Sequence, residues 1–438
     1  MDMCLMMVRD QQVNVIAITE LHLNSNHPID LLVIGGGPAG FMAAITAAEK
    51  RVPSVILLEA SAKTLEKVRI SGGGRCNATH ACWDPRELVN NYPRGRLPLL
   101  SCFSRFATGD AVAWFAERGL ELVQEADGRM FPKSNSSLEV VSCLRNSARF
   151  AGVNCFVNSV VKRIEYLKGT GFLVYVLGQQ PIKTKRVLLA TGGNPTGRKL
   201  AASLGHQIVK PVPSIFSLTL EPSSLNSCSG LALDDVDLRL VVGDKSFHQN
   251  GRILITHKGL SGPAILKLSA FAARELNIEK YHAKLFINWI NSDQNLARVS
   301  LKEFRASAGK YRLSNHRPFK KLPKRLWLAI LKDAKIDLSL RWAELPSFLE
   351  KKLLDALILD SYMINGRVPY GEEFVIAGGV NLEEVNLVRM ESLLLPGLFF
   401  SGEILDIDGV TGGFNFQHCW TSGWLAGNAI AKSLDYIN

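Results

Sequence analysis

The chain has 438 residues, of which 47% are hydrophobic and 21% are charged. This length predicts about three domains or one large nested architecture, and the two fractions are typical of a folded globular protein. They argue against a disordered, collagen-like or coiled-coil protein. No run approaches the ~18 apolar residues that a membrane helix needs, so we expect no transmembrane segment.

The positive charge of the chain is concentrated in one segment. Lysines and arginines number 51 against 40 acids, which gives a net charge of +11. Between Arg298 and Arg325 there are ten basic residues and a single acid, Glu303, so this basic segment carries +9 of that charge. Four aromatic residues stand among or beside these charges, namely Phe304, Tyr311, Phe319 and Trp327. Such a run is either a solvated basic face or a surface for nucleic acid.

We favour the nucleic-acid surface because its two chemical requirements occur together. Cations bind phosphates, and aromatic rings stack on the unpaired bases of single-stranded or looped RNA. The basic segment therefore predicts contacts with RNA. The candidate RNA-binding residues are Arg312, Arg317, Lys320, Lys321, Lys324 and Arg325.

The cysteines and the N-terminus indicate the compartment. No two of the eight cysteines are separated by only two residues, which argues against a Cys-x-x-Cys redox centre and a zinc ribbon, and we expect no metal site. Residues 1–28 lack the features of a secretory signal and the Arg- and Ser-rich, acid-poor composition of a transit peptide. We therefore expect an N-terminal extension, reduced thiols and a cytoplasmic protein.

The first recognisable element is a strand, a glycine turn and a helix. Residues 29–34 are an apolar run, and residues 41–49 have the alanine-rich content of a helix. Between them, Gly35, Gly37 and Gly40 occupy the glycine positions of G-x-G-x-x-G. In this pattern the first glycine permits a tight turn, the second lets the backbone approach a pyrophosphate, and the third brings the helix close to the strand.

A second predicted strand ends in the acid that such a site requires. Residues 54–58 are mainly apolar, and Glu59 follows them, 19 residues after Gly40. A carboxylate at this place can accept hydrogen bonds from an adenosine ribose. The order of these elements, from the first strand and its glycine turn to Glu59 after the second strand, predicts an adenosine-diphosphate site. Such a site favours FAD over FMN.

A second glycine-rich block covers residues 67–79. It contains Gly72, Gly73 and Gly74, followed by Arg75. The backbone N–H groups of such a loop, with the guanidinium, can face an anion or the edge of a flavin. A flexible surface loop is the alternative.

Two later strands also run into glycine turns. Residues 187–190 lead into Thr191 and Gly192, and residues 397–400 lead to Gly402 and Glu403. A final helix is expected over about 421–434, and its N-terminus can point at a cofactor phosphate or at the negative charge of a reduced flavin.

A long insertion separates these two nucleotide-like regions, over about residues 213–372. Strand-like segments are expected at 216–221, 238–242, 252–256 and 284–289, and helical segments at 326–333 and 342–359. We find no internal repeat of fixed period and no low-complexity segment.

These motifs resemble those of the BaiN/RdsA-type FAD-binding oxidoreductases, often labelled aminoacetone-oxidase-like, over about residues 30–431. The most specific blocks are SGGGRCN (71–77), GRMFPKS (128–134), THKGLSGP (256–263), GEILDIDG (402–409) and TGGFN (411–415). Members of this family include a large-subunit ribosomal RNA dihydrouridine synthase and a bile-acid-pathway ene reductase. The family pattern has a threonine where this chain has Ile376.

The resemblance implies an α/β fold, a glutathione-reductase-like FAD-binding Rossmann domain with an inserted β-barrel-like part and a helical part. We expect an extension (1–28), a first FAD segment (29–212), an insertion that is the candidate substrate or RNA-binding region (213–372) and a second FAD segment (373–438). The residues expected to bind FAD are Gly35, Gly37, Ala39, Gly40, Glu59, Lys67, Ser71, Gly72, Gly73, Arg75, Cys76, Asn77, Thr191, Gly192, Gly402, Glu403, Asp408, Gly412, Gly413 and Asn415.

The reaction is expected to pass directly between flavin and substrate. The chain has no second G-x-G-x-x-G for a stably bound NAD(P)H and no Cys-x-x-Cys for a dithiol relay. NAD(P)H is therefore expected as a transient reductant, or another reductase supplies the electrons. When an activated C=C bond such as uracil C5=C6 is reduced, hydride goes to one carbon and an acid protonates the other.

Two residues are candidates for that acid. Cys76 lies in the glycine-rich loop, where a thiol can be exposed to a ligand and tuned by Arg75, and a packed thiol is the alternative. His257 stands beside a glycine-containing turn, which it could equally fix by hydrogen bonds. Arg75 itself can bind the flavin, a substrate phosphate or a neighbouring carboxylate.

We expect an FAD-dependent oxidoreductase that reduces a double bond, with uridine to dihydrouridine in large-subunit ribosomal RNA as the first reading. A small-molecule ene reductase or oxidase is the second, because the flavin site would serve either substrate. An RNA- or ribosome-binding protein with a non-catalytic flavin is the third. Salt-dependent RNA binding separates the second from the others, and loss of a modified base in a deletion strain separates the first from the third.

Overall fold

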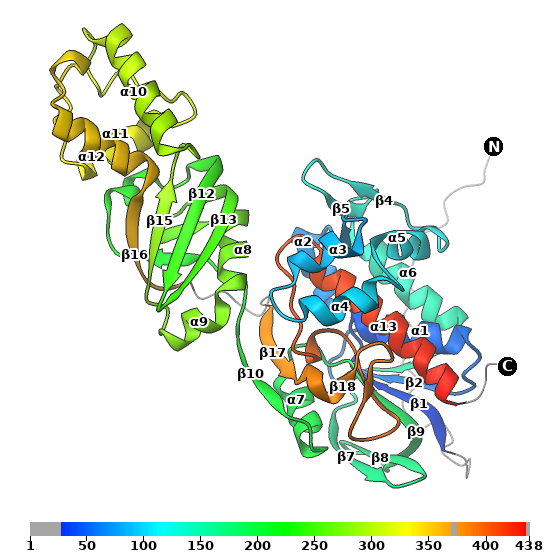
Figure 1. The fold of residues 1–438 in the computed structure, drawn as a ribbon. Coiled ribbons are helices and arrows are strands. Elements are labelled where there is room, and N and C mark those ends of the chain that lie inside the picture. The colour runs from blue at the N-terminus through cyan, green and yellow to red at the C-terminus, as the bar shows by residue number, and fades with distance from the viewer. Residues whose placement is uncertain (1–27, 369–374, 435–438) are drawn as a thin grey trace, which may run out of the picture. The chain divides into compact units, whose positions relative to one another are not determined.

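The computed structural model describes residues 28–368 and 375–434, so the expected N-terminal extension lies outside the described residues apart from Pro28 (Figure 1). The chain divides into two compact units. The first unit comprises residues up to 210 together with 378–407 and 412–438, and the second comprises 211–377 and 408–411. The first unit is therefore assembled from separated stretches of sequence, with the second inserted between them.

A nine-stranded sheet forms the centre of the first unit. Its main path runs in the order β18-β19-β20-β9-β1-β2-β6, and β8, which pairs with β7, is attached at β9. The strands are β1 (Ile29–Ile34), β2 (Val55–Leu58), β6 (Asn154–Phe156), β7 (Val161–Leu167), β8 (Gly171–Val176), β9 (Ile182–Leu189), β18 (Val385–Asn386), β19 (Glu391–Ser392) and β20 (Leu398–Phe400). β1 is parallel to β2 and β9, and β20 is parallel to β9. Parallel strands of this kind are covered on both faces, which explains their continuous apolar runs.

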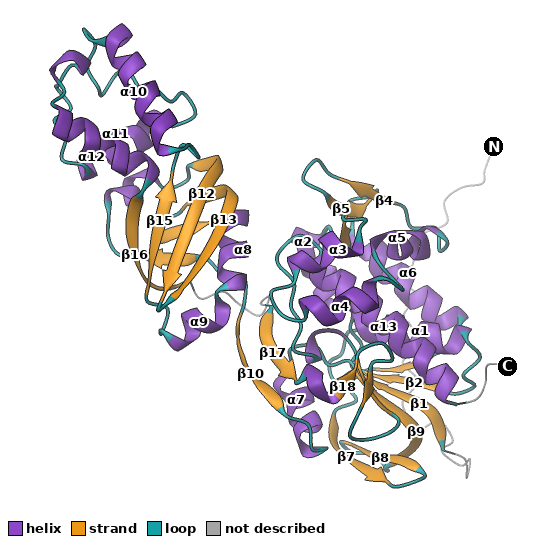
Figure 2. Cartoon of the chain, in the orientation of Figure 1, coloured by secondary structure: helices purple, strands orange, loops and turns teal. Residues whose placement is uncertain are grey.

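Two helices from opposite ends of the chain pack closely in this unit, α1 (Pro38–Glu49) and α13 (Phe414–Ser433) (Figure 2). A Cβ at Gly423 would lie 2.6 Å from Ala39 O, and one at Gly427 would lie 2.7 Å from Ala43 O. Glycine at both positions of α13 therefore lets the two backbones approach.

The remaining elements of the first unit are shorter. Its other helices are α2 (Glu66–Gly74), α3 (Pro85–Leu88), α4 (Arg96–Phe103), α5 (Thr108–Ala116), α6 (Ser137–Phe150) and α7 (Pro195–Ser203). A small sheet contains β3 (Thr79–His80), β5 (Arg129–Pro132) and β4 (Leu122–Gln124) in that order. β10 (Ile208–Pro213) and β17 (Ile376–Val380), each with residues in both units, form a separate two-stranded sheet.

A closed six-stranded barrel forms the centre of the second unit, in the order β11-β14-β13-β12-β15-β16. Its strands are β11 (Leu218–Leu220), β12 (Ala232–Val242), β13 (Lys245–Ile255), β14 (Gly259–Ser261), β15 (Ala283–Asn288) and β16 (Asp360–Arg367), and neighbours are antiparallel. The helices are α8 (Pro263–Phe271), α9 (Ala273–Ile278), α10 (Gln294–Ala308), α11 (Lys324–Asp333) and α12 (Ser347–Ile358).

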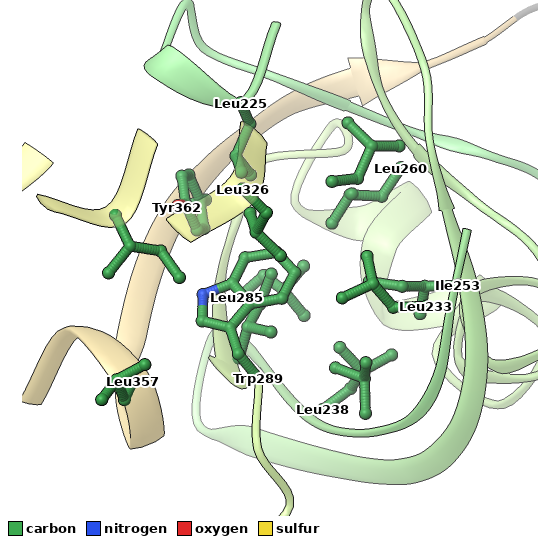
Figure 3. Packing of buried hydrophobic residues seen from close by; sticks show 14 of the residues in the cluster. Leu225, Leu233, Leu238, Ile253, Leu260, Leu285, Trp289, Leu326, Leu357 and Tyr362 are labelled. Carbon is green, nitrogen blue, oxygen red and sulfur yellow. The ribbon is translucent and has the colours of Figure 1, made fainter. Parts of the chain in front are cut away.

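One hydrophobic core joins this barrel to its helical part. Leu238 and Leu285 of the barrel belong to the same buried cluster as Leu326 of α11 and Leu357 of α12 (Figure 3). Trp327 also lies in this cluster and is fully buried. The basic segment spans parts of α10 and α11, and both helices contribute residues to this core.

The predicted fold class is confirmed, because a parallel α/β sheet and an inserted barrel with a helical part are both present. The predicted start of the last helix is wrong. α13 begins at Phe414, since Gly413 adopts a left-handed φ of +97° as its N-cap and buried hydrogen bonds hold the first turns. Trp420 Nε1, for example, donates to Ala78 O at 2.8 Å. α10 was not predicted, because its arginines and lysines were interpreted only as a charge run.

Candidate functional site

The glycine turn between β1 and α1 has two packed positions and one open position. A Cβ at Gly35, whose φ is +114°, would lie 2.4 Å from Ala190 O, and one at Gly40 would lie 2.1 Å from Gly35 O. Real side chains essentially never come so close, so both positions require glycine. A Cβ at Gly37 would meet no atom within 4 Å, and Gly37 has an ordinary φ of −88°. The protein itself does not require glycine at position 37, which leaves open space there for a ligand.

This open position lies at the N-terminus of α1. Gly37 is the N-cap, Pro38 and Ala39 begin the helix, no side chain caps it, and its first turn has no acid. The first N–H groups of a helix have no partner within the helix, and the helix dipole places partial positive charge there. The turn is therefore suited to bind a pyrophosphate through main-chain N–H groups.

Glu59 at the end of β2 is fixed beside this turn. Its Oε2 accepts the Gly36 N–H at 2.8 Å, and its Oε1 accepts both the N–H and the hydroxyl of Ser61 at 2.8 Å. Carboxylate oxygens have lone pairs for further bonds. The carboxylate is thus held where it could also accept ribose hydroxyls.

Residues 71–77 form a tight loop at the end of α2. The loop contains three successive left-handed glycines, Gly72, Gly73 and Gly74, with φ of +57°, +69° and +84°. It is closed by the Cys76 N–H, which donates to Ser71 O at 3.0 Å. A Cβ at Gly73 would meet no atom within 4 Å. Asn77 ties the loop to β5, since its Oδ1 accepts a main-chain N–H of that strand at 3.3 Å. The loop is therefore anchored at one side and open at the other.

The Arg75 side chain contacts protein groups. Its Nη2 lies 2.5 Å from Glu125 Oε1, its Nε donates to Asn135 Oδ1 at 2.9 Å, and the guanidinium lies 4.0 Å from the Phe131 ring centroid. Arg75 thus binds a neighbouring carboxylate, which is one of the three partners weighed for it.

The Cys76 thiol is fully buried, and this burial raises its pKa to about 12. The expectation of an exposed thiol tuned by Arg75 is therefore wrong. The guanidinium of Arg75 is paired with Glu125, and loss of solvent disfavours the thiolate.

An ion pair brings two distant segments together near a third. Lys67 Nζ of α2 lies 2.9 Å from Glu403 Oε2, and the charge of Glu403 raises the pKa of Lys67. A Cβ at Gly192 would lie 3.6 Å from that carboxylate oxygen and 4.0 Å from Nζ. Three of the predicted cofactor residues thus lie within a few ångströms of each other.

The predicted glycines near the C-terminus are explained by packing. Gly402, Gly412 and Gly413 have φ of +72°, +126° and +97°. A Cβ at Gly402 would lie 2.8 Å from Ala39 Cβ, and one at Gly413 would lie 2.5 Å from Thr79 O. Backbone conformation and contacts within the protein therefore require glycine at these three positions, whereas they do not require it at Gly37. Gly413 precedes α13, whose first turn includes Asn415 and has no side-chain cap.

Two other predicted cofactor residues, Thr191 and Asp408, differ in their hydrogen bonding. Thr191 Oγ1 has no hydrogen-bond partner among the described residues, and a Cβ at Gly197 would lie 1.7 Å from it, so this hydroxyl packs against α7. Asp408 is fully buried in the second unit, where its Oδ2 accepts the Ser214 hydroxyl at 2.6 Å.

His257 lies exposed on the turn between β13 and β14. The turn is held by Thr256, whose N–H and hydroxyl donate to Gly259 O at 2.8 and 3.0 Å. The alternative that His257 fixes this turn by hydrogen bonds is therefore not needed.

The basic segment contains many unpaired cations. Arg305 is bonded to Glu350, Lys321 lies 3.6 Å from Asp235, and Arg325 donates to two main-chain oxygens. The other seven have no acidic partner within the part of the chain that the structure describes: Arg298, Lys302, Lys310, Arg312, Arg317, Lys320 and Lys324.

Three of the four rings predicted to stack on bases lie in or against the core instead. Trp327 is fully buried, and Phe304 and Phe319 pack against the same cluster, where their apolar ring area is removed from water. Tyr311 alone is well exposed, at 39%, and its ring stacks on His316. His316 was missed because its sequence signal is weak, a single histidine in a basic loop.

Comparison with known proteins agrees with the Rossmann-type glycine turn described above. Residues 29–429 match the family model described as the HI0933-like protein Rossmann domain. The chain belongs to the HI0933-like family. The predicted resemblance is thereby confirmed, and with it an enzyme of an FAD-dependent oxidoreductase family.

Two curated relatives cover nearly the whole HI0933-like chain. A 3-dehydro-bile acid delta(4,6)-reductase of Clostridium scindens is 28% identical over 411 residues, which is 91% of this chain and 98% of that protein. A ribosomal RNA dihydrouridine synthase of Haemophilus influenzae is 27% identical over 419 residues, 92% of this chain and 98% of that protein. Among solved structures, the open conformation of a flavocytochrome c3 fumarate reductase matches 94% of this chain and 79% of its own, with 18% identity and a TM-score of 0.48.

A flavin dinucleotide fits the residues of this HI0933-like unit, because the space beside Gly37 is open and the N-terminus of α1 has no cap of its own. The turn from Gly35 to Gly40 would hold the pyrophosphate, Glu59 the ribose, and Lys67 a negative charge. When bound, FAD supplies two-electron redox chemistry. No helix of the described residues is long and apolar enough to cross a membrane, and no cluster among them could hold a metal ion.

Proposed function

We propose that this enzyme reduces uridine to dihydrouridine in large-subunit ribosomal RNA, with FAD as cofactor and NAD(P)H as reductant. The reaction adds two electrons and two protons across uracil C5=C6. NAD(P)H supplies the equivalent of a hydride and becomes NAD(P)⁺, and the second hydrogen arrives as a proton. The observation that carries the proposal is the group of seven cations without acidic partners on the basic segment.

These cations favour a polyanionic substrate over a small one. A cation bound to a phosphate releases counterions, so several such contacts sum to a strong attraction for RNA. The insertion, residues 213–372, is accordingly proposed as the RNA-binding region. The Haemophilus influenzae relative acts on ribosomal RNA according to its name, which supports the same substrate.

Cys76 and His257 are proposed as the two candidate proton donors. The raised pKa keeps the Cys76 thiol protonated near neutral pH, which a general acid requires, although a value of about 12 lies far from the operating pH. His257 is exposed. Cys76 is buried and His257 is exposed to solvent, and a variant of each residue tests it separately as the donor.

A small-molecule ene reductase is the second candidate function. The observation in its favour is the bile-acid reductase relative, which aligns over nearly the same length as the RNA-modifying one. A flavoprotein that only binds RNA or ribosomes is the third, and it would account for the cations without a reaction.

The deciding experiment is a map of dihydrouridine in ribosomal RNA from a strain with the gene and from a deletion strain. We expect one site to lose dihydrouridine on deletion and to regain it with the wild-type gene. Complementation with Gly37→Val, which should not retain FAD, is expected to fail. An unchanged map would exclude this function. If the purified wild-type protein also fails to bind RNA, the small-molecule function is favoured.

A further inference from the structure

Tyr311 and His316 form an exposed stack of two rings in the loop between α10 and α11. Their centroids lie 3.9 Å apart and their planes are inclined by 10°. Lys310 Nζ lies 5.3 Å from the Tyr311 ring centroid. His316 is exposed, and among the residues that the structure describes no second ring stacks on it.

Two buried tryptophans fix the backbone of this loop. Trp327 Nε1 donates to Leu313 O at 2.8 Å, and Trp342 Nε1 donates to His316 O at 3.0 Å. The main-chain N–H of Trp342 also donates to Tyr311 O at 3.0 Å. Both indoles are fully buried. The ring pair is therefore presented by a backbone that is already ordered, which lowers the entropic cost of binding a ligand.

The charges around the ring pair select the ligand. Arg312, Arg317 and Lys320 lie in the same loop and have no acidic partner in the described part of the chain. An aromatic face beside unpaired cations suits a group that combines a flat ring with phosphates. An unpaired nucleotide has both.

We propose that the Tyr311–His316 stack is a platform for one unpaired nucleobase, with the neighbouring cations on the flanking phosphates. This inference rests on the proposed function and adds to it the residues that contact a base. Every base has a π-face, so such a platform selects single-stranded over paired RNA and is tolerant of sequence. The platform would therefore favour a loop or an opened helix of the RNA.

The test compares a short oligouridylate with an oligomer of the same length in which the bases are removed. His316→Ala and Tyr311→Ala are each expected to weaken binding of the oligouridylate by about 5- to 150-fold, the range for one stacked base. Binding of the abasic oligomer, which keeps every phosphate, is expected to stay at the wild-type level. His316→Phe keeps a ring and is expected to restore most of the affinity for the oligouridylate.

A 2-aminopurine placed in the oligomer gives a second measurement, because stacking on the platform should quench its fluorescence in the wild type and not in His316→Ala. The loop is anchored through main-chain oxygens, so the alanine variants should melt like the wild type. If they weaken both oligomers equally or neither, the platform is wrong while the proposed function stands. If the wild type binds no RNA at all, the proposed function fails together with the platform.

Discussion

Lys67 Nζ and Glu403 Oε2 lie 2.9 Å apart although 336 positions separate these residues in the chain. Lys67 is half exposed and Glu403 is mostly covered, with 52% and 16% of their side chains accessible. The pair links α2 to the segment after β20, beside Gly192. It therefore brings together α2 and the turns after β9 and β20, three regions that the sequence suggested only separately.

Breaking this ion pair should cost little stability. A double-mutant cycle of Lys67→Met and Glu403→Gln is expected to give a coupling free energy of at most ~1 kcal/mol, because one partner is solvated. Chemical unfolding at low salt measures it, and high salt should reduce it further. A coupling that is zero at low salt would show that the two charges do not interact in solution.

Gly37→Val should separate cofactor binding from folding. No protein atom lies within 4 Å of a Cβ at this position, so the unfolding free energy of the apoprotein should change by no more than ~1 kcal/mol. The side chain would fill the space proposed for the pyrophosphate, and the purified variant should lose its yellow colour. Gly40→Val is the contrast, since its Cβ would lie 2.1 Å from Gly35 O and should disrupt the fold itself. Full FAD occupancy in Gly37→Val would falsify the assignment.

Two unpaired lysines should set part of the salt dependence of RNA binding. Replacing Lys320 and Lys324 together by glutamine should make the slope of log affinity against log salt less steep by about 1.4, at ~0.7 per phosphate contact for single strands. Lys245→Gln is the control, because Lys245 is exposed in the same unit and already paired with Glu275. FAD content should remain unchanged in both the double variant and the control. Equal slopes for the double variant and the control would remove this face as the RNA contact.

The two candidate proton donors can be tested by half-reactions. Cys76→Ala and His257→Asn should both bind FAD and be reduced by NAD(P)H or dithionite, since neither step uses that proton. The variant that removes the donor should transfer electrons to RNA or an enone ~10²- to 10⁴-fold more slowly. Rapid-mixing spectroscopy of flavin reoxidation measures this step. Near wild-type rates in both variants would assign the proton to another residue, a water or the substrate.

Asp360 should make the second unit less stable as the pH rises. Burial raises its pKa from 3.8 to about 6, although Tyr362 and Trp289 donate hydrogen bonds to it. Because the folded state holds this proton more tightly than the unfolded state, its stabilising contribution is complete below about pH 4 and is lost as the pH passes 6. Asp360→Asn should flatten this part of the stability profile in urea unfolding. A wild-type profile that rises between pH 4 and 6 after correction with the variant would contradict the shift.

Local backbone requirements made the first part of the fold predictable. Gly35 and Gly40 are demanded by contacts within a few residues or one neighbouring strand, so the pattern identifies the turn without knowledge of the rest. The start of α13 was different. Its first turns contain Gln417 and Trp420, which are buried and bonded to Thr79 and Ala78, and such tertiary bonds cannot be read from local composition.

In the candidate site, the glycine turn was predictable from the sequence, whereas the burial of Cys76 and of the rings in the basic segment was not. Placement in a glycine-rich loop suggested an exposed thiol for Cys76, yet the chain that folds over it decides burial. The charge of the basic segment was visible in the sequence, whereas the fate of its rings depends on which face of α11 meets the barrel. Trp327 lies on the buried face of α11, whereas Tyr311 lies in the loop before that helix and stays at the surface.

The loop between α10 and α11 is held through its carbonyl oxygens, by the indoles of Trp327 and Trp342. A carbonyl oxygen is present whatever side chain a residue carries. The positions of Tyr311 and His316 can therefore accept other residues while the loop keeps its course. Natural variation at these positions could change what the surface recognises without rebuilding the core beneath it, so one scaffold could serve chemically different substrates over evolutionary time.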